Sequence, residues 1–216
     1  MHGPSTLQSD TRGAAARFAC VHVTSGSTGQ PKGVPLNHRH FLYNILQYTN
    51  ACHISPEDRL SLLSSPSTII GVLDIYGALL NGASVHILPP VDLQSHGLVK
   101  EIKARRITIY HSVPTLLRRL VESVDEGTRF ESVRLAYLGA DRVEWSDVAA
   151  CRRAFASDVF VYTSIGSTEC STYCRWFVDD ALRQAISRPP VGWPDPNRTL
   201  MIVDGKWQPG SGRRDW

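Results

Sequence analysis

The chain has 216 residues, of which 23 are Lys or Arg and 20 are Asp or Glu, so its formal net charge is +3. An apolar fraction of 42% with so little net charge is typical of a folded globular protein and excludes an intrinsically disordered chain. The charge is too small, and the basic residues too scattered, to indicate a nucleic-acid-binding surface.

The first predicted elements are a strand, a loop and a helix. Residues 19–24 form an apolar run that predicts a buried strand, and the Ser/Thr/Gly-rich segment 25–33 predicts a loop. Asn37 is a suitable N-cap for the helix that we expect next. Residues 59–63 predict a second strand.

The clearest helix precedes a third strand. Apolar side chains recur at the spacing of one helical face, in Val72, Ile75, Tyr76 and Leu79. Gly82 ends this helix, because glycine adopts the left-handed conformation without strain. Residues 84–88 then predict a strand that Pro89 and Pro90 end.

The same alternation continues along the chain. Helices are predicted at 98–106, from Pro114 and at 148–155, with strands at 107–110, 134–138 and 159–162. Repeated strand–loop–helix units predict an α/β fold with a mainly parallel, doubly wound sheet and flanking helices. Because such sheets bind ligands at the carboxyl ends of their strands, the loops after Thr24, Leu138 and Tyr162 are candidate site loops.

The chain divides into three predicted parts. Residues 1–18 are expected to form an unstructured lead, 19–187 the α/β core and 188–216 the start of a β subdomain. Within the last part, residues 199–207 predict a hairpin, because Asp204-Gly205 suits a type I′ turn.

No apolar stretch approaches the roughly 18–20 residues of a membrane-spanning helix, and the polar N-terminus lacks the apolar segment of a signal peptide. The five cysteines are odd in number and scattered, which favours a reducing compartment over a disulfide framework. We therefore expect a cytoplasmic protein that contacts neither membrane nor nucleic acid. Cys170 and Cys174 lack a second Cys/His pair at zinc spacing.

The segment 24–33 carries the strongest chemical signal. Its three glycines let the backbone approach a ligand closely, and its four hydroxyls and backbone N–H groups can donate to phosphate oxygens. Lys32 adds a positive charge. Gly33 follows this lysine where a Walker A loop has Ser or Thr, which disfavours a P-loop NTPase. The alternative to a phosphate-binding loop is a surface turn of the same composition.

Residues 24–34 resemble the signature phosphate loop of the adenylate-forming superfamily, which includes acyl- and aryl-CoA synthetases, luciferases and adenylation domains of nonribosomal peptide synthetases. Five further segments resemble that family's motifs in the expected order, at 77–83, 108–115, 139–141, 165–169 and 191–194. The resemblance covers about residues 19–210 and is closest to peptide-synthetase adenylation domains and acyl-CoA synthetases.

The resemblance implies ATP-dependent activation of a carboxylic acid as an acyl-adenylate, with ATP and Mg²⁺ as cofactors. The acyl group would pass to the thiol of CoA or of a carrier-protein pantetheine. It implies catalytic roles for Lys32, Thr168 and Glu169, with Glu169 holding the metal. It implies nucleotide contacts from Thr24, Ser25, Gly26, Ser27, Thr28, Gly29, Lys32, Gly139, Ala140, Asp141, Ser164, Ile165, Gly166 and Thr168. It implies substrate contacts from Ile69, His111, Gly139 and Gly166.

Two residues depart from the family pattern. Ile165 stands where the family often has an aromatic residue that stacks on adenine. Ile69 stands where amino-acid-activating members have an Asp that pairs with the substrate ammonium. Asp74 is five positions further along the helix, which turns it away by roughly 140°. We therefore expect an aliphatic, aryl or hydroxy acid without an α-ammonium group.

The chain lacks several parts of the family pattern. It contains no Tyr-x-Thr-Gly-Asp motif for the ribose and no C-terminal domain with the catalytic lysine. A frameshift, premature stop or split gene would explain this, and other pieces of the same synthetase are possible partners. We expect little activity from the chain alone, and a non-catalytic remnant that binds nucleotide or is merely structural is the alternative.

Overall fold

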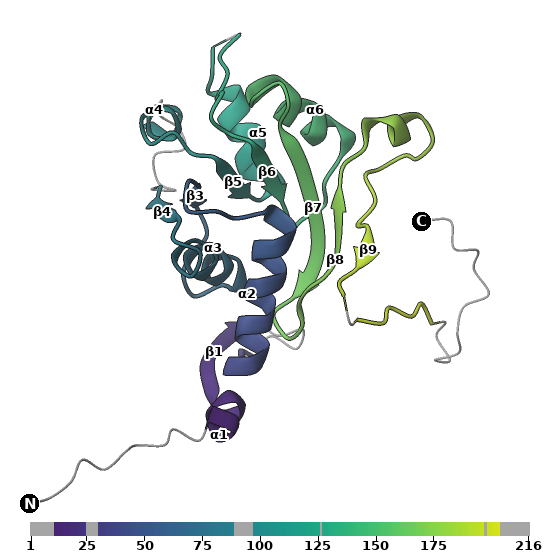
Figure 1. Cartoon of the computed structure of the whole chain (residues 1–216). Helices are drawn as coiled ribbons and strands as arrows, with labels where there is room; N and C mark the ends of the chain where they lie inside the picture. The colour runs from purple at the N-terminus through teal and green to yellow at the C-terminus, as the bar shows by residue number, and fades with distance from the viewer. Residues whose placement is uncertain (1–10, 25–29, 89–96, 126, 197, 204–216) are drawn as a thin grey trace, which may run out of the picture.

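The fold is organised around a seven-stranded sheet in the order β4-β3-β5-β6-β7-β8-β9, beside a separate two-stranded ribbon of β1 and β2 (Figure 1). The computed structural model describes residues 11–24, 30–88, 97–125, 127–196 and 198–203. The strands are β1 Phe18–Thr24, β2 Lys32–Asn37, β3 Arg59–Leu62, β4 Ser84–Ile87, β5 Ile109–Ser112, β6 Leu135–Leu138, β7 Phe160–Ser167, β8 Ser171–Phe177 and β9 Trp193–Pro194. The α-helices are α1 Thr11–Ala16, α2 His38–Cys52, α3 Ile69–Leu79, α4 Gly97–Ala104, α5 Pro114–Glu122 and α6 Trp145–Ala154, with a short 3₁₀ helix at Asp180–Gln184.

The predicted α/β fold with a mainly parallel sheet is confirmed. β4, β3, β5, β6 and β7 pair in parallel, and β8 and β9 add antiparallel strands at one edge. Figure 1 shows α2 and α3 on one face of the sheet and α5 and α6 on the other. Each face has its own apolar core, because successive side chains of a strand point to opposite faces. On β6, Leu135 and Tyr137 belong to the core under α2 and α3, whereas Ala136 and Leu138 belong to the other.

The capping residues explain where α2 and α3 begin. The side chain of Asn37 accepts a hydrogen bond of 2.8 Å from the backbone N–H of His40, as the sequence predicts. Thr68 caps α3 in the same way by accepting from the N–H of Gly71. Gly82 follows α3 with a φ of +72°, which only glycine adopts without strain.

The ribbon of β1 and β2 corrects one prediction. The sequence predicts that the segment 25–33 leads directly into a helix, but β2 intervenes and pairs with β1 so that Thr24 lies opposite Lys32. The strand was not predicted because it contains Pro35, and proline is disfavoured within sheets. It is tolerated here because β2 pairs on one side only. The loop therefore connects two strands of a hairpin.

The end of the sheet corrects a second prediction. The strand expected at 159–162 continues as β7 to Ser167, and β8 returns antiparallel to it. Gly166 has low strand propensity, and the serines on either side of Ile165 and Gly166 end the apolar run, but pairing with β8 extends the strand to Ser167. A register irregularity between Ile165 and Gly166 accommodates the glycine.

Both ends of the chain also differ in part from expectation. α1 lies inside the stretch 1–18 that the sequence predicts to be unstructured. Residues 198–202 form no strand, and the Asp204-Gly205 turn of the predicted hairpin lies outside the described residues. The division into three parts stays a prediction. No helix in the described part of the chain is long and apolar enough to cross a membrane.

Asp58 forms hydrogen bonds with several segments at the amino ends of the parallel strands. Its buried carboxylate accepts hydrogen bonds from Arg134, at 2.7 and 2.9 Å, from the Thr108 hydroxyl and from the backbone of Ser55. Burial raises the pKa of Asp58, but the hydrogen bonds from Arg134, Thr108 and Ser55 together outweigh it and hold the pKa below its ordinary value.

We predict that Asp58→Asn lowers the free energy of unfolding at pH 7 by about 1–3 kcal/mol, because Arg134 and Thr108 lose a charged acceptor. The folded-state pKa lies below the unfolded value of about 3.9, so this stabilisation is present above that pH. It is lost as the pH falls through the folded-state pKa. Urea unfolding at pH 7 and in acid measures both effects.

Glu101→Gln is the matched control, because Glu101 on α4 and Arg105 just after it are 33% and 43% exposed, and their pair contributes less than about 1 kcal/mol. Equal losses for Asp58→Asn and Glu101→Gln would contradict the role given to Asp58.

Candidate functional site

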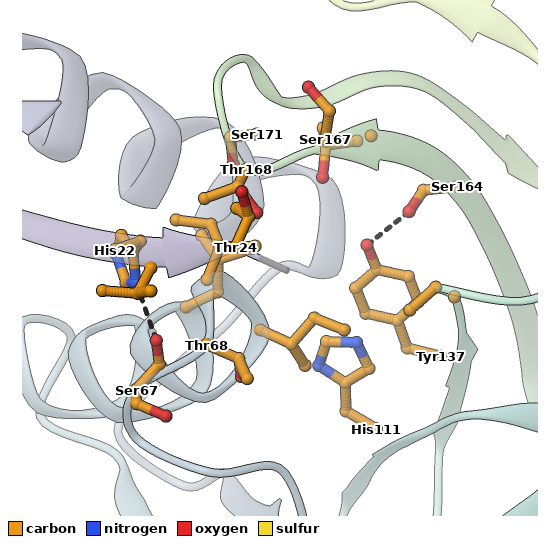
Figure 2. A pocket seen from close by; sticks show the side chains of 18 residues that line it. His22, Thr24, Ser67, Thr68, His111, Tyr137, Ser164, Ser167, Thr168 and Ser171 are labelled. Atoms are coloured by element: carbon orange, nitrogen blue, oxygen red, sulfur yellow. Dashed lines mark hydrogen bonds between the residues drawn. The ribbon is translucent and has the colours of Figure 1, made fainter. Parts of the chain in front are cut away.

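A cavity of about 450 Å³ lies at the carboxyl ends of β5, β6 and β7. Figure 2 shows side chains from several parts of the chain converging on it, with His22 and Ser67 on one side and His111 and Tyr137 on the other. This is the position at which the parallel sheet predicts a ligand site.

The strand register brings the two rings on this wall together. His111 on β5 lies opposite Tyr137 on β6, and Ser112 lies opposite Leu138. The rings of His111 and Tyr137 stack with centroids 3.8 Å apart and planes 6° apart. The hydroxyl of Tyr137 shares a 2.5 Å hydrogen bond with that of Ser164. Burial raises the pKa of Tyr137 to about 12, so the hydroxyl stays protonated near neutral pH.

A buried carboxylate lies directly behind this wall. Nδ1 of His111 lies 2.7 Å from Oδ1 of Asp74 on α3, and the side chains are 2% and 0% exposed. The hydroxyl of Tyr48 on α2 donates to the same oxygen at 2.9 Å. Burial, and then the charge of Asp74, raise the pKa of Tyr48 well above its ordinary value, which keeps it a donor. Asp74 does not line the cavity, as its helical position predicts.

The opposite wall comes from β1 and the turn before α3. His22 donates from Nδ1 to the carbonyl of Ser67 at 2.9 Å, which fixes the end of β1 against that turn. Thr24, the last residue of β1, lines the cavity. Lys32 is exposed and is not among the lining residues, although it pairs in register with Thr24. Residues 25–29 lie outside the described part of the chain.

The turn between β7 and β8 closes another side. Ser167, Thr168 and Ser171 line the cavity, whereas Glu169 is exposed at the turn. Gly166 is required here, since a Cβ at this position would lie 2.4 Å from the carbonyl oxygen of Ser171.

A second cavity of about 400 Å³ adjoins the first and shares Ala140, Ser164 and Gly166 with it. Asp141 and Ile165 also line it, together with residues 188–191. The side chain of Asp141 accepts from the backbone N–H of Arg142.

The structure gathers most of the predicted site residues. The first cavity contains Thr24, Ile69, His111, Gly139, Ala140, Ser164, Gly166 and Thr168, and the second adds Asp141 and Ile165. Lys32 and Glu169 line neither cavity, and Ser25, Gly26, Ser27, Thr28 and Gly29 lie outside the described residues. The binding and catalytic roles of all these residues stay predictions.

Several lining residues were not predicted, among them His22, Leu73, Tyr137, Ser171 and Arg188. Tyr137 had a usable signal, because it precedes the candidate Gly139 by two residues and therefore points to the same face of β6. His22, Leu73, Ser171 and Arg188 reach the site on β1, α3, β8 and the segment after the 3₁₀ helix. The order of these elements along the chain does not predict that they lie together in space.

We predict that Gly166→Ala lowers the free energy of unfolding by about 1–3 kcal/mol, because its methyl group would overlap backbone atoms of β8. Gly139→Ala is the matched control, since its nearest neighbour would be Tyr137 Cε2 at 3.4 Å. We expect it to cost less than about 1 kcal/mol. Urea unfolding compares the two, and a larger loss for Gly139→Ala would contradict the geometry of the turn.

The comparisons with known proteins agree with the fold and with the sequence motifs. A linear gramicidin synthase of Brevibacillus parabrevis is 34% identical over 194 residues, which cover 89% of this chain and 2% of that protein. Phenyloxazoline synthase MbtB of Mycobacterium sp. (strain MCS) is 32% identical over 97% of this chain and 18% of its own length. The AMPPNP-bound nonribosomal peptide synthetase FmoA3 has a TM-score of 0.78 and 29% identity, covering 90% of this chain and 21% of that one.

This chain thus spans a small part of the length of the curated relatives that it matches. The family model described as AMP-binding enzyme matches residues 5–211, nearly the whole sequence. The chain therefore belongs to the AMP-binding enzyme family, the adenylate-forming superfamily that its phosphate loop resembles.

Proposed function

We propose that this chain forms the central part of a site that converts a carboxylic acid and ATP into an acyl-adenylate and pyrophosphate. The observation that carries the proposal is the pair of adjoining cavities at the carboxyl ends of β5–β7. One cavity offers an apolar and aromatic wall for an acyl group, and the residues shared between them offer backbone contacts for a nucleotide. The AMPPNP bound to the FmoA3 relative supports ATP as that nucleotide.

The reaction needs alignment and charge neutralisation more than covalent help from the protein. A carboxylate oxygen of the acid attacks the α-phosphorus, and the bond to the pyrophosphate oxygen breaks. In this proposal Thr24 and Lys32 hold the β- and γ-phosphates, and Thr168 donates to the α-phosphate. Thr24 and Thr168 line the same cavity, and Lys32 pairs in register with Thr24.

A magnesium ion fits the donors at the β7–β8 turn. Mg²⁺ takes hard oxygen ligands and is usually bound by one or two carboxylates together with phosphates and water. Glu169 provides an exposed carboxylate next to Thr168. When bound, the ion would neutralise charge on the phosphates, and Glu169 would hold it beside the cavity wall that Thr168 lines.

The lining of the first cavity favours an acid without an α-ammonium group. Among its described residues there is no Asp or Glu, and Ile69 supplies an apolar side chain where a counter-charge would be needed. An ammonium taken out of water without a partner is costly. We therefore propose a non-amino carboxylic acid, with CoA or a carrier-protein pantetheine as acceptor. The peptide-synthetase relatives favour a carrier protein.

A non-catalytic nucleotide-binding remnant is the second candidate. It is favoured by the positions of Lys32 and Glu169, which line neither cavity. Without charged groups at the reacting phosphates, much of the rate enhancement in this kind of reaction is lost.

We predict that Lys32→Met weakens ATP binding about tenfold and leaves AMP binding unchanged, because AMP lacks the phosphates that Lys32 would contact. Calorimetric titration of both nucleotides measures this difference. Lys100→Met, an exposed lysine on α4, is the matched control and should change neither affinity. Absence of ATP binding in the wild type, or equal effects of the two variants, would contradict the proposed nucleotide site.

ATP–pyrophosphate exchange separates the two candidate functions. With a family C-terminal domain supplied in trans, we expect exchange with non-amino acids and little with α-amino acids. Exchange confined to α-amino acids would contradict the substrate class. No exchange with any acid, while ATP still binds, would favour the remnant.

A further inference from the structure

We propose that Arg198 is a positioning residue, which holds the turn between β7 and β8 against α2 by donating a hydrogen bond to the carbonyl of Cys170. This turn carries Thr168 and Glu169, to which the proposed function assigns the α-phosphate and the metal ion. Arg198 lies outside the cavity lining and acts through the turn. The inference rests on the proposed function and deepens it.

The guanidinium of Arg198 bridges the turn and the helix. Its Nη2 donates to the carbonyl oxygen of Cys170 at 2.7 Å and to Oδ1 of Asn44 on α2 at 3.3 Å. Its central carbon lies 6.0 Å from the centroid of the Tyr43 ring, which is also on α2. A planar guanidinium suits this place, because it carries several donors and is attracted to the face of an aromatic ring.

The backbone from which Arg198 extends is itself anchored. The buried carboxylate of Asp195 accepts two hydrogen bonds from the guanidinium of Arg175 on β8. The backbone N–H of Arg198 donates to the carbonyl of Asp195 at 3.0 Å. The hydroxyl of Tyr43 donates to the carbonyl of Pro196. Arg198 is therefore fixed to both β8 and α2, and it can hold the turn in one place.

The backbone of the turn adopts an unusual conformation where Arg198 contacts it. Ser171, the first residue of β8, has a φ of +58°, in the left-handed region that residues with a side chain rarely adopt. Such a conformation persists where the surrounding structure holds it. The carbonyl of Cys170 belongs to the peptide group that joins Cys170 to Ser171. The hydrogen bond from Arg198 thus fixes the orientation of that peptide group.

Arg198 supplies the charged donor at this carbonyl. Burial, and then the charge of Arg198, lower the pKa of His40, whereas a hydrogen bond between the His40 ring and the backbone of Cys170 raises it. The pKa of His40 lies below its ordinary value as a result, so its ring is neutral at pH 7. Hydrogen bonds from charged donors are stronger than those from neutral ones. The contact from Arg198 is therefore the stronger of the two.

Amide hydrogen exchange and nucleotide titration of the full chain test the inference. Arg198→Met keeps much of the length of the side chain and removes its donors. We expect the amides of residues 166–172 to exchange about tenfold faster, and the affinity for ATP with Mg²⁺ to fall about tenfold, as for the loss of a hydrogen bond from a charged group. Adenosine, which has no phosphate, should bind the variant and the wild type equally.

Arg129→Met is the matched control, because Nη2 of Arg129 donates to the carbonyl of Arg152 at 2.8 Å, outside the cavity lining. It should change neither the exchange of residues 166–172 nor the affinity for ATP. Tyr43→Leu removes the ring and the hydroxyl beside Arg198, and it should change both in the same direction as Arg198→Met. Thermal unfolding reports whether each variant folds, and Tyr43→Leu decides the question if Arg198→Met does not.

The outcomes separate this inference from the proposed function. Unchanged exchange in the folded variant would overturn the positioning role of Arg198, and so would faster exchange without a loss of ATP affinity. Equal losses for ATP and adenosine would also overturn it, because they would indicate a general distortion of the site. Failure of the wild-type chain to bind ATP would overturn the proposed function itself, while the exchange rates would still show whether Arg198 holds the turn.

Discussion

The hydrogen bonds that Asp74 accepts from His111 and Tyr48 join α3, β5 and α2 at the end of the sheet where ligands bind. A buried carboxylate is tolerated only when it is neutralised and hydrogen-bonded, so these three elements cannot shift independently. The position of α3 in turn places Ile69 and Leu73 along the cavity. One polar cluster thus sets both the packing of two helices and the shape of the proposed acyl site.

The parallel register extends this constraint across the sheet. His111, Tyr137 and Tyr162 lie opposite one another on consecutive strands, and the rings of the first two stack. Their strands then run into the loops that line both cavities. At the amino ends of the same strands, Asp58 and Arg134 form a salt bridge. Polar contacts at both ends hold the strands in one alignment, and the apolar cores on the two faces supply most of the buried surface.

The sequence predicted the structural features that depend on neighbouring residues and missed those that depend on residues far away in the chain. The apolar periodicity of α3, the Asn37 cap and the alternating strands predicted the α/β class, because helix faces and caps depend on neighbouring residues. β2 and β8 were missed because their pairing depends on distant partners that override the poor strand propensity of residues such as Pro35 and Gly166. At the site, motifs identified Thr168 and His111. His22 and Ser171 became visible only when the fold brought their strands to the cavity.

The central claim is that an acyl-adenylate lies across the two cavities, with its acyl part against Leu73 and Tyr137. A crystal structure of the chain with a bound acyl-sulfamoyl adenosine tests it most directly. The account predicts the acyl chain against Leu73 and Tyr137 in the first cavity and the nucleoside along Gly139–Asp141. An analogue seated elsewhere, or bound with its acyl group turned away from Leu73 and Tyr137, would contradict it.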